Sequence, residues 1–452
     1  MSNAEDIAKA AKAAFDESQL ILAEKRVLAL RQIKRELEAQ KYDIMFANTE
    51  DLKDAKAEVE AGRMPESMLK RLDITKPEKW HSMLRGIIDV VDLPDPTGRV
   101  AYATELDDEL ELYRVSCPIG VLLVIFEARP EVVVNIATLA IKSGNAAILK
   151  GGKESNRTTV VLADAISRGL AHVGLPKTYI QTIQTRAEVS SLLALDQYID
   201  LVIPRGSNSL VRSIQNNTRI PVMGHADGLC SVFLDESADL EKAVRVAVDS
   251  KINYPAACNA AETLIVHESL LSTIWPAVAK ALIVAEVKLF CDEATLSALS
   301  STVDAEKLKT HVQPSTPESY TTEHLSLAIS VVSLPSVSSA IQWINSHSSH
   351  HTDSIVTENN ANATAFCQGV DSAGVFVNAS TRFADGFRYG FGTEVGISTG
   401  RIHARGPVGL EGLVTYKYKM RSKAKLGHIV GEFGSGGKEF KHKTIDASSV
   451  PF

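Results

Sequence analysis

The chain has few cysteines, no long apolar run and only a modest net charge, and each shortage excludes a class of protein. Its 452 residues contain five cysteines, Cys117, Cys230, Cys258, Cys291 and Cys367. This odd number without close pairs indicates neither a disulfide framework nor a zinc site. No stretch approaches the roughly 18 uninterrupted apolar residues of a membrane span. The acidic amphipathic start lacks the apolar core of a secretory signal, so a cytoplasmic protein with reduced thiols is expected.

The composition is that of a globular protein, with 45% hydrophobic and 23% charged residues. The net charge of -7 argues against a nucleic-acid partner. The length predicts two or three domains rather than a single core.

Residues 5–95 show the spacing of amphipathic helices, with Leu30, Ile33 and Leu37 on one face. The Pro- and Gly-containing stretch 93–98 ends this pattern as a linker. The alternating segment 105–116 predicts an exposed strand or hairpin.

From Gly120 onward, short apolar runs alternate with helical stretches such as Val132–Ser143. This alternation is typical of βαβ units around a buried parallel sheet. A second α/β section is expected at about 235–395. The polar tail from residue 426 is expected to have no packed fold.

Three segments imitate ligand sites but do not fit them. The stretch Gly434–Lys438 lacks the first glycine of a phosphate-binding loop, and Gly390–Gly396 has one residue too many for a dinucleotide fingerprint. His347, His350 and His351 form a cluster in which only Asp353 adds another ligand type. A Ser- and His-rich turn is more often structural, so no metal is expected.

One cysteine lies in a context that favours chemistry. Cys258 follows Pro255 and two small residues and precedes the apolar run Thr263–Val266. Its thiol is therefore expected on a rigid, accessible loop before a core strand. A lone cysteine is more often a small buried apolar residue, so the surroundings of Cys258 decide between the two interpretations.

The segment 252–263 around Cys258 resembles the nucleophile loop of the aldehyde dehydrogenase superfamily. Other segments resemble that superfamily in the same order along the chain, namely Cys117–Val121, Ser143–Lys150, Pro204–Ser207 and Glu323. The resemblance implies an α/β fold with a Rossmann-type cofactor domain, an α/β catalytic domain and a small oligomerisation flap. It places the NADPH-binding domain at 1–104 and 117–234, the catalytic domain at 235–397, the oligomerisation elements at 105–116 and 398–425, and a polar tail at 426–452.

The resemblance also implies roles for individual residues. Cys258 would be the nucleophile, and Lys150 would contact the adenosine ribose of the cofactor. Gly206 and Ser207 would lie beneath the pyrophosphate, where a helix begins and its free N–H groups favour anions. Glu323 would bind the nicotinamide ribose.

Longer motifs resemble one branch, the gamma-glutamyl phosphate reductase family of proline biosynthesis. They are Glu127–Pro130, Ile148–Glu154, Gly224–Cys230, His347–Asp353 and Gly406–Leu413, and the resemblance covers about residues 1–425. It implies NADPH-dependent reduction of L-glutamate 5-phosphate to L-glutamate 5-semialdehyde. Phosphate would be released through a thioacyl intermediate on Cys258.

A base that hydrolytic relatives need is missing. Aldehyde-oxidising members place a Glu before the nucleophile to activate water, but the matching stretch here is Val222–His225. A reductase has no use for that water, because hydride must attack the thioacyl carbon. Two alternatives stay open: the alignment is displaced, or His225 substitutes for the Glu.

Lys153 points to the phosphorylated cofactor. NAD-dependent relatives carry a Glu three residues after the strand lysine, whereas here Lys153 follows Lys150 at that spacing. Two cations beside the ribose would attract a 2′-phosphate and favour NADPH. The alternative is a solvated lysine on a loop.

Further residues are candidates for binding the substrate. The leaving phosphate needs a cation, and Arg129 and Arg205 are the candidates, although each is also interpretable as an ordinary surface or capping arginine. The backbone N–H of Cys258 and the region of Asn259 are candidates to stabilise the oxyanion. Ser380 and Thr381 resemble the position where relatives anchor the α-carboxylate, although such a turn needs no functional reason.

The resemblance to the flap predicts a homodimer or homotetramer. Because acyl phosphates are labile in water, association with glutamate 5-kinase is a further expectation, whereas no nucleic-acid or membrane partner is expected. Two other functions are alternatives. Lys153 and the missing Glu argue against an aldehyde-oxidising dehydrogenase. The intact set of Cys258, Lys150, Gly206, Ser207 and Glu323 argues against a non-catalytic scaffold.

Overall fold

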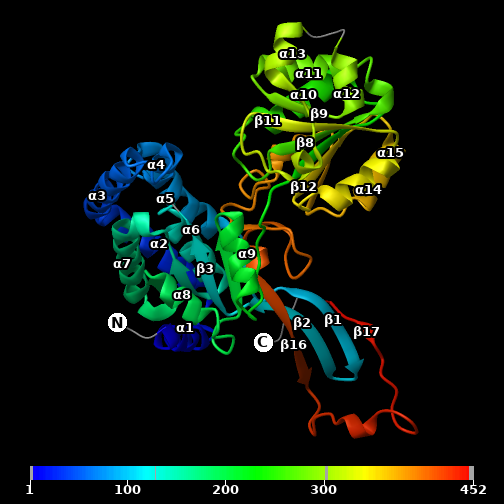
Figure 1. The fold of residues 1–452 in the computed structure, drawn as a ribbon. Coiled ribbons are helices and arrows are strands. Elements are labelled where there is room, and N and C mark those ends of the chain that lie inside the picture. Colours follow the sequence, from blue (N-terminus) through cyan, green and yellow to red (C-terminus); the bar gives the residue numbers. More distant parts are fainter. Residues whose placement is uncertain (1–3, 128, 301–303, 447–452) are drawn as a thin grey trace.

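The computed structural model of the chain describes residues 4–127, 129–300 and 304–446. Ala128 of the motif Glu127–Pro130 and the end of the tail, 447–452, lie outside the described residues. Figure 1 shows two α/β lobes and an antiparallel sheet that projects away from them. In the described part of the chain, no helix combines the length and the apolar character needed to cross a bilayer.

The helical character of the N-terminal region is confirmed. The helices before the first strand are α1 (Ala4–Ser18), α2 (Ala23–Ala39), α3 (Lys41–Glu60), α4 (Glu66–Leu72) and α5 (Pro77–Asp92). Helix α2 buries Leu30, Ile33 and Leu37, which is the face that the spacing predicts. This face packs on α7 (Asn156–His172), so α2 forms an outer layer over the first lobe.

The first lobe contains a four-stranded parallel sheet. Its strands are β3 (Val121–Phe126), β4 (Ala146–Lys150), β5 (Ile180–Ile183) and β6 (Leu201–Arg205), in the order β5-β4-β3-β6. Helices α6 (Val132–Ser143), α7 and α8 (Arg186–Leu192) connect them, and α9 (Asn208–Asn216) follows β6. Every residue of β3 and β4 is buried, as expected for central parallel strands covered on both faces.

The second lobe contains a seven-stranded sheet in which every pair of neighbouring strands is parallel. Its order is β10-β9-β11-β8-β7-β12-β13. The strands are β7 (Cys230–Leu234), β8 (Ala261–His267), β9 (Lys288–Cys291), β10 (Val312–Pro314), β11 (Ala328–Leu334), β12 (Thr352–Val356) and β13 (Gly374–Val377). The helices are α10 (Leu240–Ile252), α11 (Trp275–Val284), α12 (Glu293–Leu299), α13 (Ala305–His311), α14 (Val337–His347) and α15 (Asn360–Gly369).

The expected domain boundary needs a correction at β7. The expected first domain includes 117–234 and therefore β7, but β7 pairs with β8 and β12 of the second sheet. All five residues of β7 are buried. The sequence of a fully apolar strand does not indicate which sheet the strand joins, because either parallel sheet would bury it equally.

The third sheet is antiparallel, in the order β16-β2-β1-β17. Strands β1 (Val100–Asp107) and β2 (Leu110–Pro118) form the predicted hairpin with longer arms than 105–116, and β16 (Val414–Ser422) pairs with β2. A short ladder of β14 (Gly396–Ser398) and β15 (Gly406–Val408) lies before β16.

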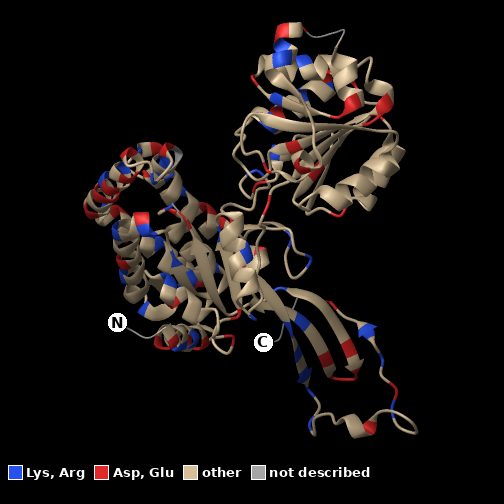
Figure 2. Ribbon diagram, viewed as in Figure 1, with Lys and Arg blue, Asp and Glu red and all other residues tan. Residues whose placement is uncertain are grey.

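The expectation that the tail lacks a packed fold is wrong. The tail contains the turn η7 (Val430–Glu432) and the strand β17 (Lys443–Thr444), which pairs with β1. Its lysines meet acidic side chains of the hairpin, with Lys438 Nζ 3.2 Å from Asp107 Oδ2. Ile445 packs against the small apolar cluster of this sheet. Figure 2 shows Lys and Arg positions, in blue, along β16 and the tail beside Asp and Glu positions, in red, on the hairpin.

The contact between α2 and α7 leaves no room for a side chain at Gly169. A Cβ at this position would lie 2.7 Å from Ile33 Cα and 2.8 Å from Ile33 N. We expect Gly169→Ala to lower the free energy of unfolding by about 2 kcal/mol, because the helices must separate. Gly431→Ala, where a Cβ meets nothing within 4 Å, is the control, with an expected change below about 0.5 kcal/mol. Urea denaturation measures both, and equal stabilities would contradict this packing.

Candidate active site

The site forms where equivalent ends of neighbouring strands converge. Strand β8 begins just after Cys258, β7 just after Gly228, and β12 just after His351. These strands are adjacent and parallel, in the order β8-β7-β12. The residues that precede them therefore meet at one edge of the second sheet, which confirms that Cys258 lies on a loop before a core strand.

The opposite edge of the first sheet supplies the other side of the site. Lys150 ends β4, Glu127 follows β3, and Arg205 ends β6. The guanidinium of Arg205 interacts electrostatically with Cys258, so the carboxyl edge of the first sheet faces the amino edge of the second. The segment 217–229 joins the two sheets and carries His225.

The loop of the nucleophile is held by its neighbours. Thr381 Oγ1 donates to the Asn259 carbonyl at 2.7 Å, and Asn259 Nδ2 donates to the Ala384 carbonyl at 2.8 Å. Gly228 packs directly on the loop, since a Cβ there would lie 2.6 Å from Cys258 Cα. Cys258 itself is partly exposed. The thiol is therefore presented on a rigid backbone without being sealed off.

Ser380 and Thr381 lie beside this loop rather than in an open pocket. Ser380 is 5% exposed and accepts a hydrogen bond from Ser250 Oγ at 3.2 Å, and Thr381 is fully buried. Their hydroxyls are engaged by the protein, Thr381 with the Asn259 carbonyl. This geometry favours a role in holding Cys258 over the expected contact with the substrate's α-carboxylate.

Two backbone N–H groups at the nucleophile are available to an oxyanion. Among the described residues, the N–H groups of Cys258 and Asn259 donate no hydrogen bond, whereas that of Ala257 donates to the Tyr254 carbonyl. The side-chain amide of Asn259 is already used by Ala384. An oxyanion contact from this region therefore comes from these two backbone groups or from the second hydrogen of the Asn259 amide.

Two arginines lie within electrostatic reach of the thiol. Burial lowers the pKa of Arg205 most strongly, Glu394 raises it, Arg129 lowers it and Cys258 raises it. Burial also lowers the pKa of Arg382, and Arg388 lowers it further, while Cys258 raises it. Neither Arg205 nor Arg382 forms an ion pair within the parts of the chain that the structure describes. Both cations therefore remain available to an anion, while Arg129 lies exposed nearby.

The expected cofactor residues lie at the edge of the first sheet and in the second lobe. Burial lowers the pKa of Lys150, and its ammonium contacts the Gly151 carbonyl. Lys153 is exposed and begins the turn η1 (Lys153–Ser155). A Cβ at Gly206 would lie 2.6 Å from Glu127 Oε2, and Ser207 is the residue before α9, without a side-chain cap.

Glu323 faces the site from the second lobe. Its Oε1 accepts a hydrogen bond from the Gly228 N–H at 3.0 Å, and burial raises its pKa. The buried pair Lys251 Nζ–Glu262 Oε2, at 2.7 Å, lies beneath this segment, because Glu262 Oε1 also accepts from the Leu325 N–H at 3.2 Å. Burial raises the pKa of Glu262 to about 7. The ion pair thus fixes the chain next to Glu323.

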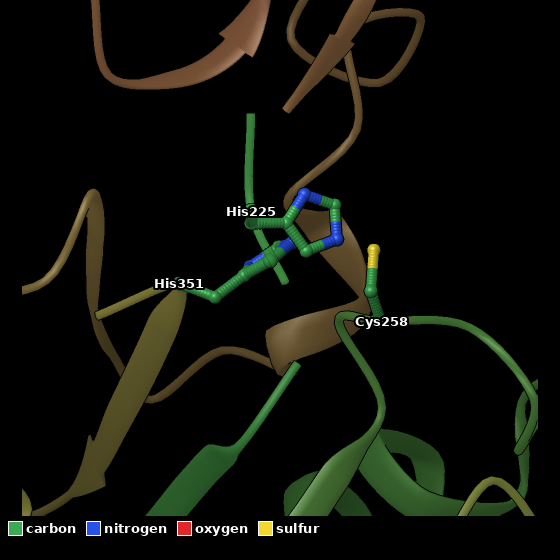
Figure 3. Close-up of side chains that lie close together, drawn as sticks. All are labelled: His225, Cys258 and His351. Atoms are coloured by element: carbon green, nitrogen blue, oxygen red, sulfur yellow. The ribbon is translucent and has the colours of Figure 1, made fainter. Parts of the chain in front are cut away.

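Histidines, not a carboxylate, surround the thiol. In the described parts of the chain, the group of His, Cys, Asp and Glu ligand atoms that lie within 4.8 Å of one another consists of His225, Cys258 and His351 (Figure 3). The other two histidines of the sequence cluster turn elsewhere: His347 stacks on Trp343, and His350 Nδ1 lies 2.6 Å from the Asp371 carbonyl.

Comparisons with known proteins agree with this geometry. The model of the aldehyde dehydrogenase family matches residues 1–324, so the chain belongs to that family. A probable gamma-glutamyl phosphate reductase of Schizosaccharomyces pombe is 50% identical, with 99% of this chain and 98% of that protein covered. The gamma-glutamyl phosphate reductase of Saccharomyces cerevisiae is also 50% identical, with both chains fully covered.

A solved structure supports the same relationship. The crystal structure of gamma-glutamyl phosphate reductase from Thermotoga maritima has a TM-score of 0.88 and 35% identity, covering 93% of this chain and 99% of that one. Within the aldehyde dehydrogenase family the chain is thus a gamma-glutamyl phosphate reductase, an oxidoreductase of proline biosynthesis. The tail lies inside the relationship, because the two yeast relatives align with 99% and 100% of the chain.

Two residues of the site were not chosen from the sequence. Arg382 directly follows Ser380 and Thr381 in the chain, and in the sequence His351 is only one member of a histidine cluster. Their relation to Cys258 depends on strand neighbours far apart in the chain. The one available signal was their presence in motifs that resemble the family.

Gly228 offers a direct test of the nucleophile's placement. Gly228→Ala should lower kcat about 100-fold, because its Cβ would displace the backbone of Cys258 and misplace the thiol. In Gly86→Ala, by contrast, the new Cβ meets only Asn135 Oδ1, at 3.9 Å, so kcat should stay within about twofold. Steady-state kinetics on both variants gives the comparison. An unimpaired Gly228→Ala enzyme would show that this contact does not set the position of Cys258.

Proposed function

We propose that the chain reduces L-glutamate 5-phosphate to L-glutamate 5-semialdehyde with NADPH, through a thioacyl intermediate on Cys258. The observation that carries the proposal is the setting of Cys258: a partly exposed thiol faces two arginines and two histidines, with no carboxylate in its immediate group. A thioester in this setting lacks the carboxylate base that activates water in aldehyde-oxidising relatives. Phosphate release and reduction are then the productive steps.

The residues of the chain divide the first half of the reaction among them. The Cys258 thiolate attacks the acyl carbon, which is the general behaviour of an activated cysteine. The N–H groups of Cys258 and Asn259 stabilise the oxyanion. Arg205 and Arg382 attract the phosphate and the α-carboxylate, since guanidinium groups bind both anions well.

The residues fit a phosphorylated nicotinamide cofactor. Lys150 and Lys153 present two cations at the end of β4, Gly206 and Ser207 precede α9, and Glu323 keeps Oε2 for a ribose hydroxyl. Two cations beside the ribose favour a 2′-phosphate. When bound, NADPH supplies the hydride that reduces the thioester.

The antiparallel sheet is proposed as the surface for self-association. Strand β16 is an edge strand, and Tyr416, Tyr418 and Met420 on it are each more than half exposed. An edge with exposed apolar side chains is a ready partner for a second strand. A homodimer or homotetramer would cover it. Association with glutamate 5-kinase and a cytoplasmic location stay predictions.

The reverse reaction tests the chemistry. With glutamate 5-semialdehyde and NADP⁺, we expect NADPH to form beyond one equivalent per active site only when inorganic phosphate is added, because phosphate rather than water resolves the thioester. Cys258→Ala should abolish the reaction, and absorbance of NADPH reports both. Equal rates without phosphate would instead identify an aldehyde-oxidising dehydrogenase.

Cofactor preference tests Lys153. Lys153→Glu should shift the ratio of kcat/KM for NADPH over NADH by at least about tenfold toward NADH, because a carboxylate would repel the 2′-phosphate. Lys177→Glu replaces an exposed lysine elsewhere on the same lobe and should leave the ratio unchanged. If both variants have the same ratio of kcat/KM for NADPH over NADH, Lys153 does not bind the 2′-phosphate.

A further inference from the structure

Two histidines face the nucleophile from separate elements (Figure 3). His225 lies in the segment between the sheets, and His351 directly precedes β12. Their rings are 5.3 Å apart at 86°, and a ring nitrogen of each lies within 4.8 Å of the other and of Cys258 Sγ. The steps proposed above use neither ring, so their convergence on the thiol needs its own explanation.

The hydrogen bond of His225 fixes where its proton resides. Nδ1 lies 3.1 Å from the Ile397 carbonyl oxygen, and a carbonyl can only accept. Nδ1 therefore carries the hydrogen, and Nε2 of the neutral ring keeps a lone pair. In Figure 3 this far side of the ring points toward Cys258 Sγ. The geometry is that of a base oriented by a second group.

His351 also has a ring nitrogen, Nε2, that is free to form a hydrogen bond near the thiol. The residue is 1% exposed, and its Nδ1 lies 2.9 Å from Thr352 Oγ1. Its Nε2 is buried without a hydrogen-bond partner among the described residues. A buried polar atom without a hydrogen-bond partner destabilises the protein. We therefore expect a polar group of the bound substrate to form a hydrogen bond with Nε2.

The chemistry of the reaction indicates that this substrate group is the phosphate. Without a proton, phosphate would depart from the acyl carbon as a strongly basic trianion. The thiol, in turn, must lose a proton before it attacks. One base between the two groups satisfies both needs, because the proton that Cys258 gives up is the one that the phosphate requires.

We propose that His225 takes the proton of Cys258 and delivers it to the departing phosphate, while His351 Nε2–H donates a hydrogen bond to that phosphate. The Sγ–carbon bond forms, and the carbon–oxygen bond to phosphate breaks with its electron pair on oxygen. The proton moves from Sγ to His225 Nε2 and then to that oxygen. Monohydrogen phosphate leaves and His225 is again neutral. This assignment deepens the function proposed above and rests on it.

Other charged and titratable groups lie near His225 and Cys258. The carboxylates of Glu323 and Glu394 interact with His225, and burial raises the pKa of both. Arg205 and Arg382 interact with Cys258, and Cys230 lies behind it, with its Sγ 3.3 Å from the Cys258 carbonyl. The variants below leave these groups in place, so a change in pH profile reports the histidine.

His225→Asn is the sharpest variant, because an Asn amide takes the place of Nδ1 and keeps a donor for Ile397 while Nε2 is removed. We expect the rate of Cys258 alkylation by iodoacetamide at pH 7 to fall about tenfold and to recover above about pH 9, where the thiolate forms without a base. The value of kcat/KM should fall about 100-fold. Mass spectrometry of the Cys258 peptide separates this signal from the exposed Cys367. His347→Asn is the matched control and should change neither quantity.

His351 is tested through phosphate in the reverse reaction. His351→Asn keeps the Nδ1 position and loses Nε2, so the KM for phosphate should rise at least about tenfold while alkylation of Cys258 stays normal. His351→Gln returns an amide donor near the Nε2 position and should recover most of the affinity. A structural role would not separate Asn from Gln in this way.

The outcomes of these experiments separate a failure of the proposed proton transfer from a failure of the proposed reductase function. Activity in Cys258→Ala, or turnover without phosphate, would overturn the proposed function itself. If both of those tests succeed but His225→Asn shows a wild-type alkylation profile and kcat/KM, only the proton transfer is wrong. Should His225→Asn fail to fold, His225→Gln gives the same comparison of alkylation at pH 7 and above about pH 9.

Discussion

The backbone contact between Gly228 and Cys258 constrains the rest of the site. It exists because β7 and β8 are parallel neighbours, so the residues that lead into them meet at one edge. Only glycine allows an approach in which a Cβ would lie 2.6 Å from Cys258 Cα. The same convergence brings His351 in from β12, and the buried Thr381 closes the loop from the other side. The thiol therefore has its position before any ligand arrives.

Once the thiol is fixed, charge decides which chemistry follows. Arg205 and Arg382 make the site attractive to anions, and ring nitrogens of two histidines lie within 4.8 Å of the thiol sulfur. A carboxylate in their place would activate water and hydrolyse the thioester. The sequence has no Glu at Val222–His225, and the fold places histidines beside the thiol. Both features favour reduction with release of phosphate.

Local signals were enough for much of the fold and for the nucleophile. The helix expected at Val132–Ser143 is α6, and the apolar run Thr263–Val266 lies within β8, because the local sequence patterns are unambiguous there. The long motifs placed Cys258, Lys150, Gly206, Ser207 and Glu323 in one family pattern. Two features of the fold were not predicted from the sequence, because they depend on residues far apart in the chain. Strand β7 joins the second sheet, and the basic tail docks on the acidic hairpin through contacts such as Lys438–Asp107, 331 residues apart. His351 and Arg382 escaped for the same reason.

The thioacyl intermediate is the central claim, and it is directly observable. The protein would be mixed with glutamate 5-semialdehyde and NADP⁺ in a buffer free of phosphate, quenched in acid and digested for mass spectrometry. We predict that the Cys258 peptide gains the mass of one glutamyl group, and that adding phosphate before the quench removes it. A Cys258 peptide that stays unmodified while NADPH is formed would contradict covalent catalysis at this residue.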